Sequence, residues 1–517
     1  MSTRRAWWTL GGLIVAAGAV LRFWGLGDVG ISQWDAGSYL AGPLGLGPYG
    51  TYEFLLFYAP PLVPWMHEML FMLNGGVSDT PAIALHALIG SLTVLATGLV
   101  GRRLVGRAAG WVGAAALAGM EYHVIYSRQP LTEAAYTLLF VLAVGAGFVG
   151  WRDGHRRDWV ICGLWTGTAC LVKYHGFFPL IVIAGLVLLG WWQPFRAEER
   201  DHEEPAPASP LGANSLRGLL LAGLVAAVPA TALLVSIANE VGLSAFSVNR
   251  EQWLPEPGLY LIPQTARYLL ACLTAWVSPI VLLAALGGVI ALQLRRTPGG
   301  VVVLWWLVLF AGTLPLYKNY PRLPVPMLPA LALAAGVGLV ALASRLRPGI
   351  ESSARAVAVL AAFVLAADAV GLHETLSVSD RGYAELAQWL REAETTDGLA
   401  GDAPDILVVQ HAVLPYLAED AHPFFCYDDP GAAWALESGD FRHLVFDLRS
   451  IHAPEFTAWR DAHADEITLV HRIGNPLPEP FLVNAAGFEA LHELQAPDTP
   501  EPRLRELTEI RVWRRER

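Results

Sequence analysis

The sequence predicts a polytopic α-helical membrane protein with about 11 transmembrane helices and a C-terminal soluble α/β domain. Composition is the first reason: 54% of the 517 residues are apolar, only 16% are charged, and the mean hydropathy is +0.43. Soluble domains carry about 25% charged residues. The second reason is a change in charge, because residues 373–517 hold 27 Asp and Glu against 12 Arg, whereas residues 1–372 hold 19 acidic and 23 basic side chains. We therefore divide the chain into a membrane part, 1–372, and an extracytoplasmic part, 373–517.

Apolar runs define the predicted spans, since a helix needs about 20 apolar residues to cross a bilayer core of about 30 Å. The runs are 7–21, 81–100, 108–126, 131–150, 158–172, 176–192, 217–237, 266–291, 298–316, 323–343 and 354–372. Successive loops lie on alternating sides of the membrane. The loops on the side of the N-terminus carry sixteen basic residues, and the loops on the opposite side carry seven. Positive charge resists translocation, so the first set is expected in the cytoplasm. This places the N-terminus in the cytoplasm and the acidic tail outside the plasma (inner) membrane.

Three connecting segments differ in composition from ordinary loops. The outer loop 22–80 is rich in aromatic residues, which predicts helices lying along the membrane surface, broken at Pro60-Pro61. The outer loop 238–265 is also amphipathic. Together the two loops would cover a cavity at the outer ends of the spans. The segment 193–216 is polar and rich in proline, which predicts a cytoplasmic linker.

The acidic tail alternates helix-like and strand-like stretches. Candidate strands are 405–410, 423–427, 443–448 and 467–473, and candidate helices are 383–394 and 454–463. Such alternation predicts a small α/β sheet domain. The tail contains no glycine-rich phosphate loop and no nucleophile motif.

Lysine usage singles out two positions on the outer side. Of 35 basic residues only Lys173 and Lys318 are lysines, and both fall at outer ends of predicted spans. An ammonium group is a compact charge with three donors, which suits phosphate binding. The structural alternative is that these side chains reach towards the membrane interface. Because Asp35 lies just past the first span on the same side, the pattern indicates chemistry on a lipid-carried phosphate substrate.

Five motifs occur in a fixed order on this side. The first, RFWGLGDVGISQWDAGSYL, carries Arg22, Asp35 and Tyr39, and the second is APPLVPWMHEMLF. The others are SRQPLTEAAY with Arg128 and Glu133, LVKYHGFFPL with Lys173 and His175, and YKNYPRLPVPMLPALAL with Lys318, Tyr320 and Arg322. This order resembles that of GT-C glycosyltransferases of the protein O-mannosyltransferase and lipid A aminoarabinose transferase type. The resemblance covers about residues 1–345 and implies the GT-C fold.

The resemblance implies a hexosyl- or pentosyltransferase that moves a sugar from a polyprenyl-phosphate donor to an extracytoplasmic acceptor. The acceptor is a protein, a glycan or a glycolipid. Since the phosphate is already a stable anion, the reaction needs no general acid, and one carboxylate suffices as base. Asp35 is the predicted base, and attack opposite the phosphate predicts inversion. Candidate substrate-binding residues are Lys173, Lys318, Arg128, Glu133, Arg322, Tyr39, Tyr320 and His175. The tail would recognise the acceptor or shield the site.

Each candidate residue also has a structural interpretation. Asp35 suits a helix cap, and Glu133 suits the first turn of a helix. Arg128 and Arg322 are compatible with ordinary interfacial positions, and tyrosines are common in aromatic belts. His175 has no partner at metal-ligand spacing, so no metal is assigned to it.

Two departures from the family pattern bear on function. Ala36 follows Asp35 where relatives often have Glu, and Tyr58-Ala59 precedes the double proline where the aminoarabinose branch has Glu-Lys. These departures argue against a divalent metal and against aminoarabinose as the sugar. They leave open a catalytically inactive GT-C-like scaffold. A lipid-linked sugar transporter or flippase is the other alternative, although such proteins favour internal repeats that this sequence lacks. No nucleic-acid partner is expected.

Overall fold

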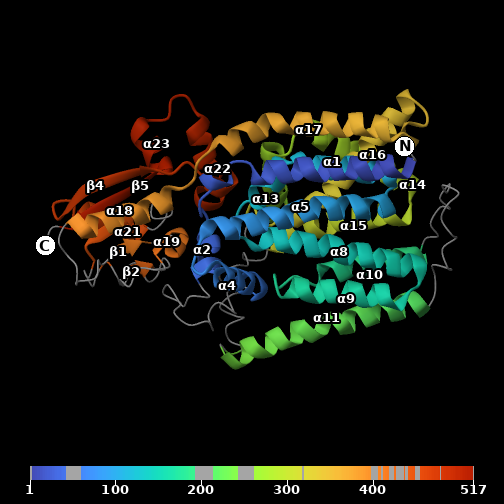
Figure 1. The fold of residues 1–517 in the computed structure, drawn as a ribbon, viewed down its shortest axis with the longest axis horizontal. Coiled ribbons are helices and arrows are strands. Elements are labelled where there is room, and N and C mark those ends of the chain that lie inside the picture. Colours follow the sequence, from blue (N-terminus) through green and yellow to red (C-terminus); the bar gives the residue numbers. More distant parts are fainter. Residues whose placement is uncertain are drawn as a thin grey trace.

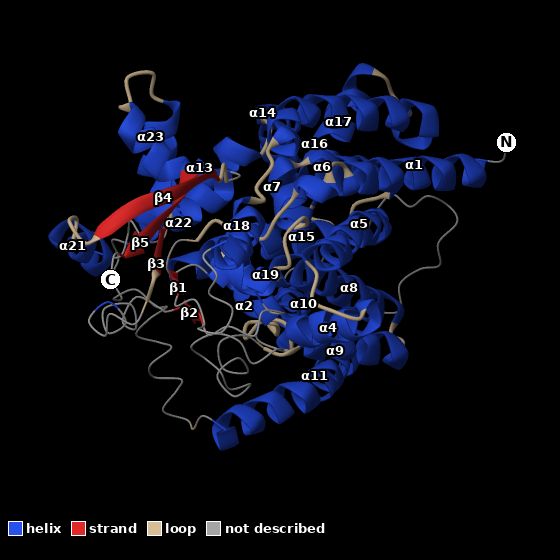
Figure 2. Ribbon diagram, turned by 60° about the vertical axis from the view of Figure 1, so that its left-hand side comes forward, coloured by secondary structure: helices blue, strands red, loops and turns tan. Residues whose placement is uncertain are grey.

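The structure is a computed structural model, in which most residues form one bundle of helices with a small sheet at one end (Figure 1, Figure 2). The described residues are 3–41, 60–192, 213–240, 242, 261–316, 320–396, 406–408, 411–417, 424–426, 436, 441–448, 454–477 and 479–515. The N-terminal end of the chain lies at the end of the bundle far from the sheet (Figure 1).

Helices of the membrane part follow the predicted apolar runs. They are α1 (Thr3–Phe23), α5 (Asp79–Leu104), α6 (Arg107–Gly119), α7 (Glu121–Tyr126), α8 (Thr132–Asp153), α9 (Arg156–Cys170), α10 (Phe178–Trp192), α11 (Ala213–Glu240), α13 (Leu261–Trp276), α14 (Pro279–Arg295), α15 (Pro298–Thr313), α16 (Leu328–Leu346) and α17 (Ala354–Ser377). Within the described ranges, six helices are long and apolar enough to cross a membrane, or seven if one bent pair is a single span. The fold is thus mostly helical and multi-pass, and the number of about 11 spans stays a prediction.

The prediction of one uninterrupted helix across 266–291 is wrong. The chain breaks after Trp276, and α14 starts at Pro279, whose missing N–H suits the first position of a helix. Ser278 caps the new helix, because its Oγ accepts a hydrogen bond from the N–H of Val281 at 3.4 Å. The run 108–126 breaks similarly at Met120, between α6 and α7. Apolar composition continues through both breaks, so hydropathy alone does not reveal them.

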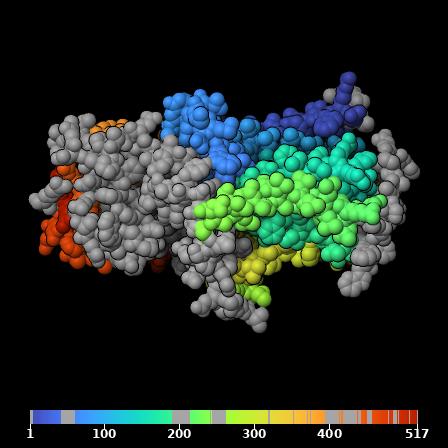
Figure 3. All heavy atoms as spheres, turned by 90° about the horizontal axis from the view of Figure 1, so that it is seen from below, coloured from blue at the N-terminus to red at the C-terminus, as the bar shows by residue number. Residues whose placement is uncertain are grey.

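Glycines allow α14 and α16 to pack with their backbones in contact. A side chain at Gly288 would collide with the carbonyl oxygen of Ala334, and one at Gly338 would collide with that of Ala284. Close backbone approach at small residues is a typical source of helix association in membranes. In contrast, α11 lies on the outside of the bundle, on the face shown in Figure 3. Its Leu220, Leu224 and Val228 are largely exposed, as expected for a surface that faces lipid.

Short elements cover the sheet end of the bundle. These are η1 (Leu26–Asp28), α2 (Trp34–Ala41), α4 (Leu62–Asn74), η3 (Leu314–Leu316) and η4 (Val325–Met327). Helix α4 begins directly after Pro60-Pro61, where the sequence predicts a break, and exposes Met69, Met72 and Leu73. Residues 42–59, most of the loop 238–265 and most of the linker 193–216 lie outside the described residues.

The tail forms a five-stranded mixed sheet in the order β2-β1-β3-β5-β4. Its elements are α18 (Gly382–Thr396), β1 (Ile406–Val408), α19 (Leu414–Leu417), β2 (Phe424–Cys426), β3 (His443–Phe446), α21 (Pro454–Ala462), β4 (Ile467–Gly474), α22 (Glu479–Gln495), α23 (Glu501–Thr508) and β5 (Glu509–Arg515). Strand β1 is parallel to β2 and β3, whereas β5 is antiparallel to β3 and β4. The sequence analysis missed α22, α23 and β5. Buried Ile510 and Val512 alternate with more exposed residues in β5, which is the signal that could have found this strand.

The contact between α14 and α16 predicts opposite effects at two adjacent glycines. Gly288→Ala should destabilise the protein, because the new methyl group meets the backbone of α16. Gly287→Ala is the matched control, since nothing lies within 4 Å of its added Cβ. Alanine is favoured over glycine in a helix by about 1 kcal/mol, so this variant should be neutral or more stable. Thermal unfolding in detergent measures both, and equal unfolding temperatures would contradict the packing described.

Candidate functional site

Asp35 and Arg322 form a buried ion pair at the sheet end of the helix bundle. Asp35 is 6% exposed, and the Arg322 side chain is 14% exposed. Burial lowers the pKa of Arg322 to about 10, so the guanidinium stays positively charged at neutral pH. The pair brings together α2 and the segment before α16, which lie far apart in the sequence.

Helix α2 fixes the direction of Asp35 by burying its neighbours. Ala36 and Leu40 are completely buried in the hydrophobic core. Asp35 and Tyr39 follow the same four-residue spacing, which places them together on the adjoining strip of the helix. The burial of Ala36 also gives a packing reason for the departure from the family pattern, since a Glu at this position would be a buried charge.

The segment that carries Arg322 is held by hydrogen bonds and prolines. The Tyr122 hydroxyl donates to the carbonyl of Pro321, and the Trp306 Nε1–H donates to the carbonyl of Pro326 at 3.0 Å. Each proline also fixes its own backbone φ angle. The Arg322 guanidinium lies over the Tyr320 ring, 5.4 Å from its centre. Arg322 is therefore oriented by an aromatic face as well as by Asp35.

A second buried ion pair joins Lys173 and Glu133. The Lys173 Nζ lies 2.6 Å from Oε1 of Glu133, and the two side chains are 11% and 0% exposed. Glu133 lies in the first turn of α8, and Lys173 lies in the turn between α9 and α10. This turn requires glycine at position 176, because a side chain there would collide with the backbone of Ala169 and Cys170.

Tyr39 places the second pair beside helix α2. Its phenol lies next to Thr132 and within electrostatic reach of Glu133; burial and then the Glu133 charge raise the pKa of Tyr39, so the hydroxyl stays protonated. Asp35, Arg322, Glu133, Lys173 and Tyr39 are from here on called the ion-pair cluster. It contains two cations, two carboxylates and a neutral hydroxyl, all close to one end of the bundle.

His175 lies at the edge of the ion-pair cluster and is neutral. Its ring packs edge-on against Tyr136, and the Tyr136 hydroxyl donates to the His175 carbonyl at 3.0 Å. Burial and the nearby Lys173 charge lower the pKa of His175 to about 3. At neutral pH this side chain adds a polar group without adding charge.

Two other predicted residues have different surroundings. The Arg128 guanidinium donates long hydrogen bonds, of 3.4 Å, to the carbonyls of Leu21 and Gly25 and is attracted by Asp28 and Asp380. These contacts tie it to the start of the first outer loop. Lys318 lies outside the described residues. Within the described part of the chain, no three His, Cys, Asp or Glu side chains gather into a group that could hold a metal ion.

Arg22, which opens the first motif, joins α1 to the end of α6. It is completely buried, and its Nη1–H groups donate to the carbonyls of Gly18 at 2.8 Å and Ala118 at 3.1 Å. Its Nη2 lies 2.6 Å from Nδ1 of His123. Since α6 ends at Gly119, Ala118 is one of the terminal carbonyls that lack a partner within the helix. Arg22 therefore holds the bundle end together beneath the first outer loop.

The sequence analysis missed a set of contacts between the tail and the first outer loop. The Asp380 carboxylate accepts from the N–H of Gly30 at 2.8 Å. The Tyr416 hydroxyl accepts from the N–H of Ile31 and donates to Asp79, both at 2.9 Å, and Arg381 lies 3.4 Å from Asp79. These bonds fix the chain just before α2, so the tail helps to position Asp35. No sequence signal in the tail distinguishes these residues from other polar side chains.

The buried pair Glu133–Lys173 predicts a strongly non-additive pair of mutations. Glu133→Gln or Lys173→Gln alone leaves one buried charge without its partner, which costs about 3–5 kcal/mol. The double variant Glu133→Gln/Lys173→Gln should recover part of this loss, as thermal unfolding of all three proteins would measure.

The control is the partly exposed pair of Arg152 and Asp153 at the other end of α8, whose side chains are 26% and 32% exposed. Arg152→Gln should change stability little, since exposed pairs contribute about 0–1 kcal/mol. If the two single variants at Glu133 and Lys173 were as stable as this control, the buried pairing would be refuted.

Comparison with known families and structures bears on the sequence family and the fold of the chain. Residues 58–198 match the sequence model of the family described as dolichyl-phosphate-mannose-protein mannosyltransferase. This range includes Arg128, Glu133 and Lys173, and it excludes Asp35 and Arg322. No curated protein sequence matches the chain.

Three solved structures share the fold over most of the chain. ArnT from Cupriavidus metallidurans bound to undecaprenyl phosphate has a TM-score of 0.58 at 16% identity, covering 89% of this chain and 96% of that one. The Archaeoglobus fulgidus oligosaccharyltransferase in complex with zinc and sulfate has a TM-score of 0.56 at 11% identity, covering 98% and 88%. AglB from the same organism, with an inhibitory peptide and a dolichol-phosphate, has a TM-score of 0.53 at 13% identity, covering 88% and 71%.

These identities are low, so the structures show the fold, while the family match rests on the sequence of residues 58–198. The resemblance drawn from the five motifs is confirmed at both levels: the chain has the GT-C glycosyltransferase fold, and its residues 58–198 carry the sequence pattern of the dolichyl-phosphate-mannose-protein mannosyltransferase family.

Proposed function

We propose that this protein is a membrane glycosyltransferase that moves a sugar from a polyprenyl-phosphate donor to an acceptor on the outer side of the plasma membrane. The observation that carries the proposal is the ion-pair cluster, in which two buried carboxylates and two mostly buried cations lie at one end of the bundle. Two proteins of the same fold were solved with undecaprenyl phosphate and with a dolichol-phosphate, which supports a lipid-linked phosphate as the donor.

In the proposed reaction Asp35 acts as the general base. The acceptor hydroxyl attacks the anomeric carbon, and its proton passes to the Asp35 carboxylate as the new C–O bond forms. The bond between the anomeric carbon and the phosphate oxygen breaks at the same time, and its electron pair leaves with the polyprenyl phosphate. Attack from the face opposite the phosphate inverts the anomeric centre. Because the leaving group is already a stable anion, no second carboxylate is needed to protonate it.

Arg322 and Lys173 are the proposed phosphate-binding residues. Both are cations held in fixed positions by a carboxylate, so little reorganisation is needed when negative charge develops on the leaving group. Lys318, Tyr320 and Arg128 remain further candidates from the sequence. Glu133, Tyr39 and the neutral His175 are proposed to bind sugar hydroxyls, since they offer both acceptors and donors.

The alternative of an inactive scaffold predicts that the cluster has no catalytic role, and the transporter alternative predicts movement of an intact donor. The buried Asp35–Arg322 pair favours the enzyme, because an inactive scaffold gains little stability from a buried pair compared with apolar side chains of similar volume. The orientation with the N-terminus in the cytoplasm, taken from the distribution of arginines, places the cluster on the extracytoplasmic side.

Asp35→Asn should reduce the release of polyprenyl phosphate from a polyprenyl-phosphate sugar, in the presence of cell-envelope extract, by about 100-fold or more, because the base is lost. The assay uses purified protein in lipid. Asp461→Asn is the control, since Asp461 lies in the tail with its side chain 63% exposed and should retain wild-type turnover.

The outcomes separate the hypotheses. Full turnover by Asp35→Asn would keep the enzyme and reject Asp35 as its base. No turnover by the wild type, across several sugars and extracts, would contradict the proposed function and favour the inactive scaffold.

A further inference from the structure

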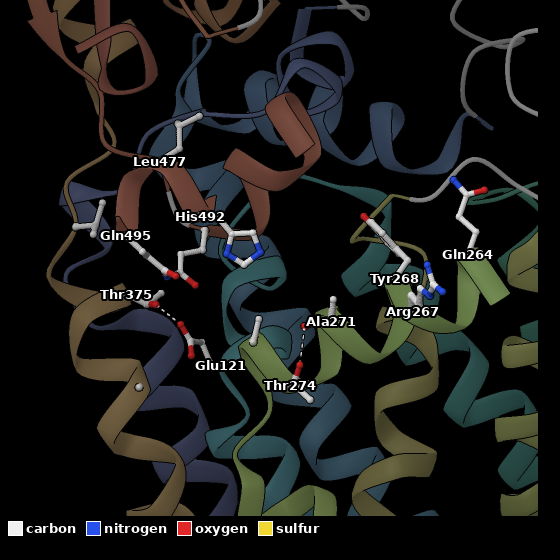
Figure 4. Close-up of a pocket in the computed structure, with 14 residues that line it drawn as sticks. Glu121, Gln264, Arg267, Tyr268, Ala271, Thr274, Thr375, Leu477, His492 and Gln495 are labelled. Atoms are coloured by element: carbon white, nitrogen blue, oxygen red, sulfur yellow. Dashed lines mark hydrogen bonds between the residues drawn. The ribbon is translucent and has the colours of Figure 1, made fainter. Parts of the chain in front are cut away.

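A hollow lies between the membrane part and the tail, apart from the ion-pair cluster. It has a volume of about 830 Å³ and is bounded by α13, the start of α7, the end of α17 and helix α22. Figure 4 shows Glu121, Thr375, His492 and Gln495 on one side of it and Tyr268, Arg267 and Gln264 on the α13 side. Binding pockets for small organic ligands span about 300–1,000 Å³, so this pocket is large enough for a ligand of two or three sugar units.

Hydrogen-bonded polar groups form part of the lining of this pocket. Glu121 accepts a hydrogen bond from the Thr375 hydroxyl. Glu479 accepts from Trp276 Nε1–H at 3.2 Å and from Gln495 Nε2–H at 3.1 Å. Helix α13 contributes Gln264, Arg267 and Thr274, three and seven residues apart on one face. The pocket thus presents oriented carboxylates beside amide, hydroxyl and guanidinium donors.

The charge balance of the lining distinguishes between classes of ligand. Two carboxylates, Glu121 and Glu479, face one cation, Arg267. A phosphate would be opposed by this surplus of negative charge, whereas the ion-pair cluster supplies cations for it. The apolar side chains of the lining are Leu477, Val378, Ala271 and Ala275. A neutral, hydroxyl-rich molecule binds through paired hydrogen-bond donors and acceptors and needs no excess of positive charge.

The wall of the pocket reaches the ion-pair cluster through two tyrosines. Tyr268 lines the pocket and lies within electrostatic reach of Tyr320. The Tyr320 ring lies under the Arg322 guanidinium, which pairs with Asp35. These side chains connect the wall of the pocket with the proposed base. The pocket therefore adjoins the residues that orient Arg322 at Asp35.

We propose that this pocket binds the acceptor and that the acceptor is an uncharged glycan. The proposal rests on the proposed glycosyltransferase function and specifies its acceptor class. Sugar units in the pocket bind to Glu121, Glu479 and the polar face of α13. One terminal hydroxyl of the glycan lies at Asp35, gives up its proton there and forms the new bond to the anomeric carbon, while the polyprenyl phosphate leaves.

The test measures how donor turnover divides between transfer and hydrolysis. Purified protein in lipid receives a radiolabelled polyprenyl-phosphate sugar and a cell-envelope extract, which is afterwards separated into glycan, protein and lipid fractions. Free labelled sugar reports hydrolysis by water. In the wild type the label should enter the glycan fraction; label confined to the protein or lipid fraction would overturn the proposal.

Variants of residues that line the pocket then test whether the acceptor binds there. Ala275→Trp fills the pocket from α13, so the ratio of glycan transfer to hydrolysis should fall about tenfold, equivalent to about 1.4 kcal/mol of acceptor binding. Glu479→Gln, which changes charge with little change in shape, should raise the KM for the glycan fraction. Leu270→Trp is the control, since Leu270 lies on the same helix, is 62% exposed and does not line the pocket.

Two further outcomes would contradict the pocket as the acceptor site, and a third would contradict the proposed function. A wild-type ratio in Ala275→Trp, with the same thermal stability as Leu270→Trp, would overturn the pocket as the acceptor site. Loss of hydrolysis together with transfer in Ala275→Trp would also overturn it, because the pocket would then serve the donor. Absence of any donor turnover by the wild type would instead contradict the proposed function itself.

Discussion

Burial of opposite charges at one end of the helix bundle is the constraint on which the site depends. An ion removed from water is destabilised by several kcal/mol unless an opposite charge is close and well oriented. Asp35 with Arg322, and Glu133 with Lys173, meet this requirement. Each pair also joins elements that are distant in the sequence, so the charges that would perform the chemistry also determine how the outer segments pack.

The same pairing balances the charges of the ion-pair cluster. Each cation of the ion-pair cluster is paired with a carboxylate, so the four charged residues of the cluster together carry no net charge. In the proposed mechanism a donor phosphate competes for Arg322 and Lys173, which leaves the Asp35 carboxylate next to the acceptor hydroxyl. Contacts from the tail to Gly30, Ile31 and Asp79 hold the loop that leads into α2. The tail thereby affects the position of Asp35 without touching it.

Much of this arrangement is predictable from local sequence features. Apolar runs locate the helices of the membrane part, and Pro60-Pro61 locates the start of α4, because both signals act within a few residues. The motif order also identified Asp35, Arg322, Glu133 and Lys173 as candidates. Their pairing was not predictable, since it depends on the packing of α2 against the segment before α16 and of α8 against the turn after α9.

Other features could not be predicted from the sequence, because local caps or contacts between distant residues determine them. The break at Ser278 occurs within continuous apolar sequence, where a cap and a proline outweigh hydropathy. Strand β5 is rich in arginine, and only its pairing between β3 and β4 buries Ile510 and Val512. The pocket between α13 and α22 combines residues from both parts of the chain, so neither part reveals it alone.

The most direct test of the central claim, that the ion-pair cluster binds a lipid-linked phosphate, is the affinity for undecaprenyl phosphate measured by native mass spectrometry. Arg322→Gln and Lys173→Gln should each bind it about tenfold more weakly than the wild type, since each removes a charge-assisted hydrogen bond. Arg156→Gln, which changes an exposed residue at the start of α9, should bind it normally. Equal affinities in the wild type and both cluster variants would contradict the account.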